Sequence, residues 1–175
     1  ATILLVAVFL VGVCLLLYPT VSDYWNSLHQ TRAIGAYEDT LAAMTQEDYS
    51  GLFAQADDYN AALRTLGYPL TEYKTLAERP ELTEYSRLLD VNGTGVMGYI
   101  DIPKIGVELP IYHGVDASVL NIAAGHLEGT SLPVGGEGTH CVLSAHRGLP
   151  SARLFTDLDR LAVGDTFTIT TLNRL

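Results

Sequence analysis

Positive charge is scarce in this sequence, and no charged side chain occurs before Asp23. Ten Lys and Arg stand against 20 Asp and Glu in 175 residues, which gives a net charge of −10. A nucleic-acid site needs clustered Lys and Arg to neutralise phosphates. The charge balance therefore argues against nucleic acid as a partner and favours a solvated acidic surface.

Cysteine is also scarce, with Cys14 and Cys141 as the two examples. Cys14 lies within an apolar run, where a small packing or lipid-facing role is the simplest interpretation. A disulfide between the two would join that run to a distant strand, so none is expected. The sequence contains no His-Glu-x-x-His, and its histidines follow no compact zinc spacing. We therefore expect no metal and no other cofactor.

The apolar run "ATILLVAVFLVGVCLLLY" spans residues 1–18 and predicts a transmembrane helix that Pro19 ends. At 1.5 Å per residue this helix is about 27 Å long, close to the roughly 30 Å hydrocarbon core of a bilayer. A cleaved signal peptide is the rival interpretation, but "YPTVSD" offers no small-x-small cleavage site. No initiator Met precedes the run and the last residues stop near the end of a strand pattern, so we expect a fragment cut at both ends.

Two amphipathic helices are predicted after the apolar run. Within residues 23–46, one helical face carries Ile34, Tyr37, Leu41 and Met44; within residues 48–67, it carries Leu52, Ala56, Tyr59 and Leu63. Both faces are interpreted as packing surfaces. Residues 67–90 contain two prolines and predict a surface loop with a short helical piece around residues 81–89.

From residue 96 the apolar period changes to two, which indicates strands. Strands are expected over residues 96–103, 105–112, 139–146 and 166–172, with short helices over residues 116–125 and 154–162. Ile105, Val107, Leu109 and Ile111 share one face of the second strand. Closely spaced strands with Gly and Pro turns favour a mainly β fold, a barrel or a sandwich, over a parallel α/β sheet.

Cys141 and His146 are the first candidates for catalysis, because Cys with His is a common nucleophile and base. They are five residues apart, so in a regular strand they point to opposite faces and lie roughly 16 Å apart. A nucleophile and its base need contact at about 3 Å. Cys141 shares its face with Leu143 and Ala145, and we therefore interpret it as a core residue.

His146 lies at the end of the predicted strand, before "RGLP", where side chains emerge into loops that can carry a site. A lone His is more often structural or solvated than catalytic. Ser144 lies on the same face, so a Ser/His dyad is conceivable, although the sequence has no Gly-x-Ser-x-Gly elbow. The residues alone leave these alternatives open.

Four longer motifs occur in a fixed order: "YPTVSDYWN" after the apolar run, "GYIDIPKIGVELPIYHG", "GHLEGTSLPVGG" and "THCVLSAHRGLPSARLFTDLDRLAVGD". Together they resemble the first half of a class C sortase, the type that assembles pili. The resemblance covers nearly the whole chain. It implies a partial sortase-type β-barrel over residues 91–175, preceded by a transmembrane helix (1–18) and an extracellular helical segment with a lid-like loop (19–90).

Sortases are membrane-anchored cysteine transpeptidases on the outside of Gram-positive bacteria. The resemblance implies cleavage of a Leu-Pro-x-Thr-Gly sorting signal between Thr and Gly, with the acyl group held as a thioester. In class C a Lys amine of a pilin subunit then attacks the thioester. The expected partners are therefore a pilin, or another surface protein with a sorting signal, and the cell membrane.

The family's catalytic His falls on His146, in "SAHRG". Its Cys, in a Thr-Leu-x-Thr-Cys motif, and its Arg have no match in these residues, so the 175 residues alone are expected to be inactive. The Asp-Pro-aromatic motif of class C lids is also missing from residues 67–90, where "ERPEL" is the nearest proline context. The alternatives are a membrane-tethered β-barrel binding module, a sortase that attaches proteins to the cell wall, and a serine hydrolase that uses Ser144.

Overall fold

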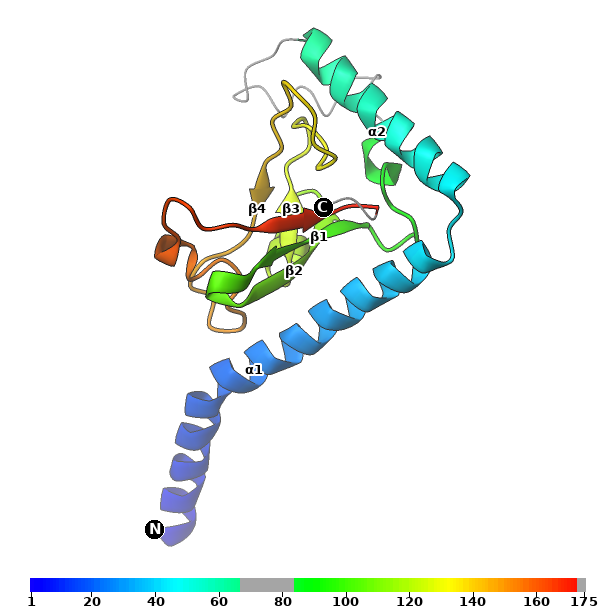
Figure 1. The fold of residues 1–175 in the computed structure, drawn as a ribbon. Coiled ribbons are helices and arrows are strands. Elements are labelled where there is room, and N and C mark those ends of the chain that lie inside the picture. The colour runs from blue at the N-terminus through cyan, green and yellow to red at the C-terminus, as the bar shows by residue number, and fades with distance from the viewer. Residues whose placement is uncertain (67–83, 173–175) are drawn as a thin grey trace.

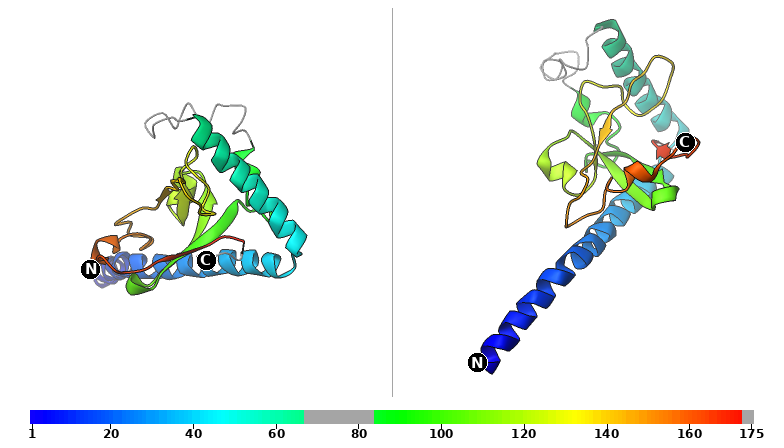
Figure 2. Two further views of the ribbon diagram at one scale, coloured as in Figure 1. Left: turned by 45° about the horizontal axis from the view of Figure 1, so that its top comes forward. Right: turned by 90° about the vertical axis from the view of Figure 1, so that its left-hand side faces the viewer.

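The computed structural model describes residues 1–66 and 84–172 and combines two long helices with one small sheet (Figure 1). The helices are α1 (Thr2–Ala42), α2 (Gln46–Leu66) and α4 (Ala117–Leu120); 3-10 turns cover Tyr85–Arg87, Pro103–Ile105 and Leu158–Arg160. The strands are β1 (Val96–Ile102), β2 (Val107–His113), β3 (Ala124–His126), β4 (Leu143–Ser144) and β5 (Thr168–Thr170). In both Figure 1 and Figure 2 the sheet lies in the angle between α1 and α2.

Helix α1 is one continuous helix, so the prediction that Pro19 ends the apolar helix is wrong. An interior proline costs a helix about 3 kcal/mol, but stopping and restarting the helix would leave backbone groups unpaired at two new ends. The N-terminal part of α1 is angled away from the rest of the helix in Figure 1. This part does not pack on the domain: Ile3 is 87% exposed, and the helix is long and apolar enough to cross a membrane.

The second half of α1 packs on β1 and β2, as its amphipathic pattern predicts. Ile34, Tyr37 and Leu41 are buried, and Met44 packs against the same core. The pattern of the second helix is confirmed in the same way, because α2 buries Ala56 and Tyr59 and partly buries Leu52 and Leu63. The predicted helical piece near residue 85 is a single 3-10 turn, and residues 67–83 of the lid-like loop expected over residues 67–90 lie outside the described residues.

The sheet has the strand order β4-β3-β2-β1-β5, and the prediction of a mainly β, partial barrel is confirmed. All strand pairs are antiparallel except β2 with β3. Strands β1 and β2 form a hairpin in which Ile100 faces Leu109 and Ile102 faces Val107. Gly106, with φ 61°, closes the turn between them. The alternation therefore places one face of this hairpin in the core.

Three predicted elements differ from the structure. Residues 139–142 were expected to be strand, but the strand covers Leu143–Ser144 alone. The segment before it runs beside residues 127–131 without a regular ladder, because Ser131 Oγ and Thr130 Oγ1 accept the backbone N–H groups of His140 and Val142. Residues 154–162 form turns around one 3-10 turn rather than a helix, and Leu154 has φ 42°. The helix expected over residues 116–125 is the single turn α4, and Ala124–His126 form strand β3, which was not expected.

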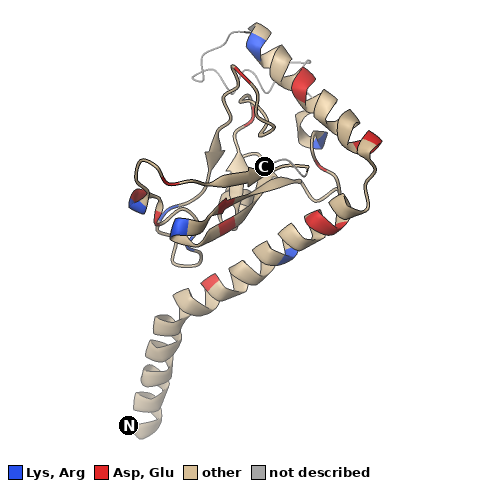
Figure 3. Ribbon diagram, in the orientation of Figure 1, with Lys and Arg blue, Asp and Glu red and all other residues tan. Residues whose placement is uncertain are grey.

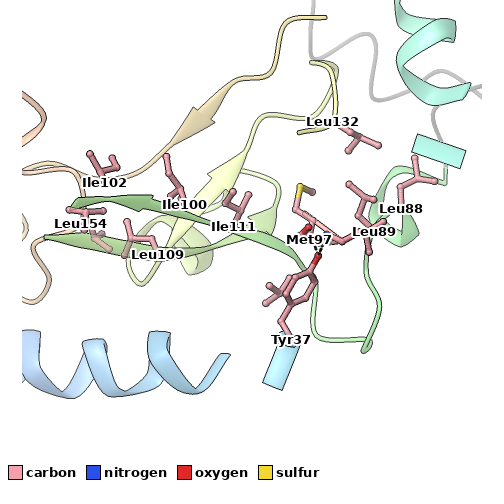
Figure 4. Packing of buried hydrophobic residues seen from close by; sticks show 14 of the residues in the cluster. Tyr37, Leu88, Leu89, Met97, Ile100, Ile102, Leu109, Ile111, Leu132 and Leu154 are labelled. Carbon is pink, nitrogen blue, oxygen red and sulfur yellow. Dashed lines mark hydrogen bonds between the residues drawn. The ribbon is translucent and has the colours of Figure 1, made fainter. Parts of the chain in front are cut away.

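The core lies between the sheet, the C-terminal half of α1 and α2 (Figure 4). Tyr37 reaches into it from α1, and its hydroxyl donates to the backbone carbonyl of Met97 at 3.0 Å. The same hydroxyl accepts the backbone N–H of Leu172 at 3.1 Å. One side chain therefore joins α1, β1 and the segment after β5.

Candidate active site

His146 lies two residues after the end of β4 and is partly exposed, as its place near a strand end predicts. Its backbone carbonyl accepts the N–H of Phe155 at 3.1 Å. The chain between these two residues therefore leaves His146 and returns beside it. An imidazole at such a position can exchange protons with a group that approaches from solvent.

The loop between His146 and Phe155 is held by polar contacts. The Arg147 guanidinium pairs with the Asp159 carboxylate at 3.0 Å. The backbone N–H of Gly148, whose φ is 77°, donates to Thr156 Oγ1 at 3.0 Å. These contacts hold the backbone on the C-terminal side of His146.

The same loop is tied to α1, far away in the sequence. The Asp23 carboxylate accepts the backbone N–H of Arg153 at 2.7 Å. The amide Nδ2 of Asn26 donates to the carbonyl of Ser151 at 2.8 Å. Sequence reasoning missed both contacts because nothing in the local pattern relates α1 to a loop about 130 residues later.

Cys141 was expected to be a core residue of a strand, but it precedes β4 and is only partly buried. It lines an apolar cavity of about 300 Å³ together with Leu143, Ile100, Ile102 and Ile169. Burial raises the pKa of its thiol to about 12, so the thiol stays protonated near neutral pH. Cys141 and Cys14 are both free cysteines, in agreement with the expectation that no disulfide joins them.

Ser144 lies in β4 opposite Gly125. In the part of the chain that the structure describes, no hydrogen bond joins Ser144 to His146. A serine nucleophile needs a base in hydrogen-bond contact to be activated. The geometry therefore gives the Ser/His dyad no support.

His126 has a structural role. It is fully buried in β3, where Tyr85 Oη lies 2.9 Å from Nδ1 and the Ser131 carbonyl lies 2.9 Å from Nε2. Burial lowers its pKa to about 4. The neutral imidazole can donate from Nε2 to Ser131 and accept the Tyr85 hydroxyl proton at Nδ1, so both ring nitrogens are paired.

His113, at the end of β2, faces two backbone carbonyls. Its Nδ1 lies 3.0 Å from Gly95 O and its Nε2 lies 2.8 Å from Leu88 O. His140 is exposed and precedes β4. Among residues 1–66 and 84–172, no group of three or more His, Cys, Asp or Glu could hold a metal ion.

A protein-family model described as "Sortase domain" matches residues 100–174. The solved structure of sortase C1 from Streptococcus agalactiae is 44% identical, with a TM-score of 0.71; the match covers 82% of this chain and 72% of that one. A sortase C from Streptococcus pneumoniae is 36% identical with a TM-score of 0.67, over 81% and 69% of the two chains. Sortase C-1 from the same species is 37% identical, also with a TM-score of 0.67, over 81% and 71%. A comparison with curated proteins gave no match.

Proposed function

Because the chain belongs to the sortase family and is similar to solved sortase C structures, we propose that it is a pilin-joining cysteine transpeptidase. It cleaves a Leu-Pro-x-Thr-Gly sorting signal between Thr and Gly and transfers the acyl group to a Lys amine of a pilin subunit. The resemblance to sortase C of Streptococcus pneumoniae, whose structure was described in relation to pilin substrate specificity, supports this choice of partner.

The observation that carries the proposal is the position of His146 within "SAHRG", partly exposed at the end of β4. In the reaction His146 gives a proton to the departing Gly amine. It then takes a proton from the incoming Lys amine. An imidazole suits both transfers because its ordinary pKa lies close to neutral.

The nucleophile is a Cys other than Cys141, whose thiol is held protonated in an apolar cavity. A thiolate is required to attack the scissile carbonyl and form the thioester. The family's Arg is likewise not assigned to Arg147, which pairs with Asp159. The 175 residues alone therefore supply the acid–base group and its support, and we expect them to show no turnover by themselves.

The loop after His146 contributes by holding the backbone of the acid–base group. Phe155 binds the carbonyl of His146, and Asp23 binds the backbone of Arg153 two residues earlier. A catalytic imidazole must be held close to its productive position, since small displacements lower the rate strongly. These contacts supply the restraint from two directions.

The N-terminal half of α1 is proposed as a single-pass membrane anchor that leaves the sheet outside the cell. The residues from Thr2 to Ser22 carry no charge and, at 1.5 Å per residue, measure about 31 Å, which matches the bilayer core. Figure 3 shows this part of the helix without Lys, Arg, Asp or Glu.

The test of the proposed function uses the protein as its gene encodes it. It is incubated with a Leu-Pro-x-Thr-Gly peptide, a Lys-containing acceptor and a cell-wall amine acceptor, and the products are identified by mass spectrometry. The proposal predicts the Thr-to-Lys amide product and the released Gly peptide. Binding of the peptide without either product would instead identify a membrane-tethered binding module. A product joined to a cell-wall amine but not to Lys would identify a cell-wall sortase.

A further inference from the structure

The position of the uncharged segment in α1 indicates how close one part of the domain lies to the membrane. The uncharged residues Thr2–Ser22 match the thickness of a bilayer core, and Asp23 is the first charged side chain after them. If this segment crosses the bilayer, as proposed above, Asp23 lies among the lipid headgroups. Tyr24 and Trp25, which are 64% and 62% exposed, occupy the level where such aromatic side chains gather.

The loop after His146 is held at this same level. Asp23 accepts the backbone N–H of Arg153, and Asn26 donates to the carbonyl of Ser151, so the loop lies against the first turn of α1 beyond the apolar segment. In Figure 1 this loop lies beside α1 close to the bend of the helix. Residues 147–153 are therefore the part of the domain that the contacts place nearest to the bilayer.

The composition of the loop suits an anionic lipid surface. Residues 147–153, "RGLPSAR", contain two Arg and no acidic residue. The side chains of Arg147 and Arg153 are 63% and 62% exposed, although each pairs with a carboxylate. A guanidinium has five N–H donors, and one carboxylate leaves some of them free for phosphate oxygens.

The charges around the loop balance, unlike those of the acidic chain as a whole. Arg153 shares Asp157 with Arg160, which lies 3.9 Å from that carboxylate, and Arg147 pairs with Asp159. Three guanidinium groups therefore meet three carboxylates here, because Asp23 also contacts the loop, and the cluster is neutral whereas the whole chain carries a net charge of −10. Each basic residue close to an anionic membrane surface raises the equilibrium constant for binding to that surface about fivefold.

We propose that residues 147–153 dock on an anionic phospholipid surface, with Arg147 and Arg153 binding headgroup phosphates. This proposal rests on the membrane anchor of the proposed function. Arg153 is two residues, roughly 7 Å of chain, from Phe155, whose N–H binds His146. Docking therefore holds His146 close to the bilayer surface, and a substrate reaches it there rather than far out in solution.

The experiment uses the sequence's single Trp as a built-in reporter. The chain is reconstituted in phosphatidylcholine vesicles with or without phosphatidylglycerol, doped with a lipid that carries a nitroxide quencher on its headgroup. Quenching of Trp25 measures the anchor. A second protein, Trp25→Phe with Pro150→Trp, reports on the exposed tip of the loop.

We expect quenching of Trp25 in both kinds of vesicle, and quenching of the reporter at position 150 that is stronger with phosphatidylglycerol. Adding Arg147→Gln and Arg153→Gln should weaken docking roughly fivefold for each Arg removed, and salt should have the same effect. Arg87→Gln, on the 3-10 turn at the other end of the domain, is the matched control and should change nothing. Near-ultraviolet circular dichroism establishes that each variant is folded.

Quenching of Trp25 without quenching at position 150 would overturn the docking proposal and leave the anchor intact. Equal quenching at position 150 in both vesicles would overturn the role of anionic headgroups. Absence of Trp25 quenching would overturn the anchor itself, and with it the docking surface, while leaving the transpeptidase assay as an independent test of the reaction.

Discussion

The side chain of Asn60 pairs with the backbone of Leu132 through both of its polar atoms. Its Oδ1 accepts the Leu132 N–H at 2.7 Å, and its Nδ2 donates to the Leu132 carbonyl at 3.3 Å. Both residues are buried. The amide therefore takes the place of a neighbouring strand for Leu132 and fixes α2 to the segment between β3 and β4.

Asn60→Ala should lower the free energy of unfolding by about 1–3 kcal/mol, because it leaves the buried N–H of Leu132 without a partner, while the carbonyl still accepts the N–H of Val134. Urea denaturation followed by circular dichroism measures the change. Asp58→Ala, at an exposed position of the same helix, is the matched control and should stay within about 0.5 kcal/mol of the parent. Equal effects of the two substitutions would show that the pairing contributes nothing specific.

Tyr37→Phe should also destabilise the fold by about 1–3 kcal/mol, since it removes the hydroxyl that pairs with Met97 and Leu172. Tyr99→Phe provides the control, because its hydroxyl donates to the exposed Glu38 and water can replace that contact. The comparison is made by thermal and urea unfolding of the two variants. A Tyr37→Phe protein as stable as Tyr99→Phe would contradict the assigned role of Tyr37.

Stability should fall in acid because of His126. Burial lowers the pKa of this imidazole to about 4 in the fold, against an ordinary value of 6.5. Below pH 6.5 the imidazole of His126 is therefore protonated in the unfolded chain but stays neutral in the folded chain. The free energy of unfolding decreases as the pH falls towards 4. The loss is about 2 kcal/mol between pH 7.5 and pH 5.

Urea unfolding at several pH values measures this dependence. His126→Gln should flatten the curve between pH 6.5 and 4, whereas His140→Gln, at an exposed position, should leave its slope unchanged. Parallel curves for the parent and His126→Gln would mean that another group causes the acid sensitivity.

The thiol of Cys141 should react slowly in the folded protein. A pKa of about 12 instead of 9.0 reduces the thiolate fraction about a thousandfold near neutral pH. In a Cys14→Ser background, iodoacetamide should therefore modify Cys141 at least about a hundredfold more slowly in the fold than in urea. Reaction at the rate of a free thiol would contradict its placement in the apolar cavity.

Sequence reasoning predicted the elements with long, regular patterns. The face of Ile34, Tyr37 and Leu41 and the alternation of β1 and β2 were both readable because burial follows a helical or strand period there. It also separated Cys141 from His146 by strand parity; Cys141 lines an apolar pocket, although it is only partly buried and precedes the strand.

The features that sequence reasoning missed depend on partners far away in the chain. Strand β3 has only three residues, and Gly125 at its centre is required because an added Cβ would lie 2.3 Å from Gly114 O. Residues 139–142 alternate like a strand, but side-chain oxygens of Thr130 and Ser131 replace the ladder. No local sequence pattern predicts such contacts, and none predicts the hydrogen bond between Asp23 and the backbone of Arg153.

The catalytic assignment of His146 is the central claim, and the rate of transpeptidation by His146→Ala tests it most directly. In the protein as its gene encodes it, the measurement compares kcat/KM of the parent, His146→Ala and the exposed-site control His140→Ala on a Leu-Pro-x-Thr-Gly peptide with a Lys acceptor. The account predicts a loss of about 10²–10⁴-fold for His146→Ala, with His140→Ala within about twofold of the parent. A His146→Ala protein that retains the parent rate, while correctly folded, would contradict it.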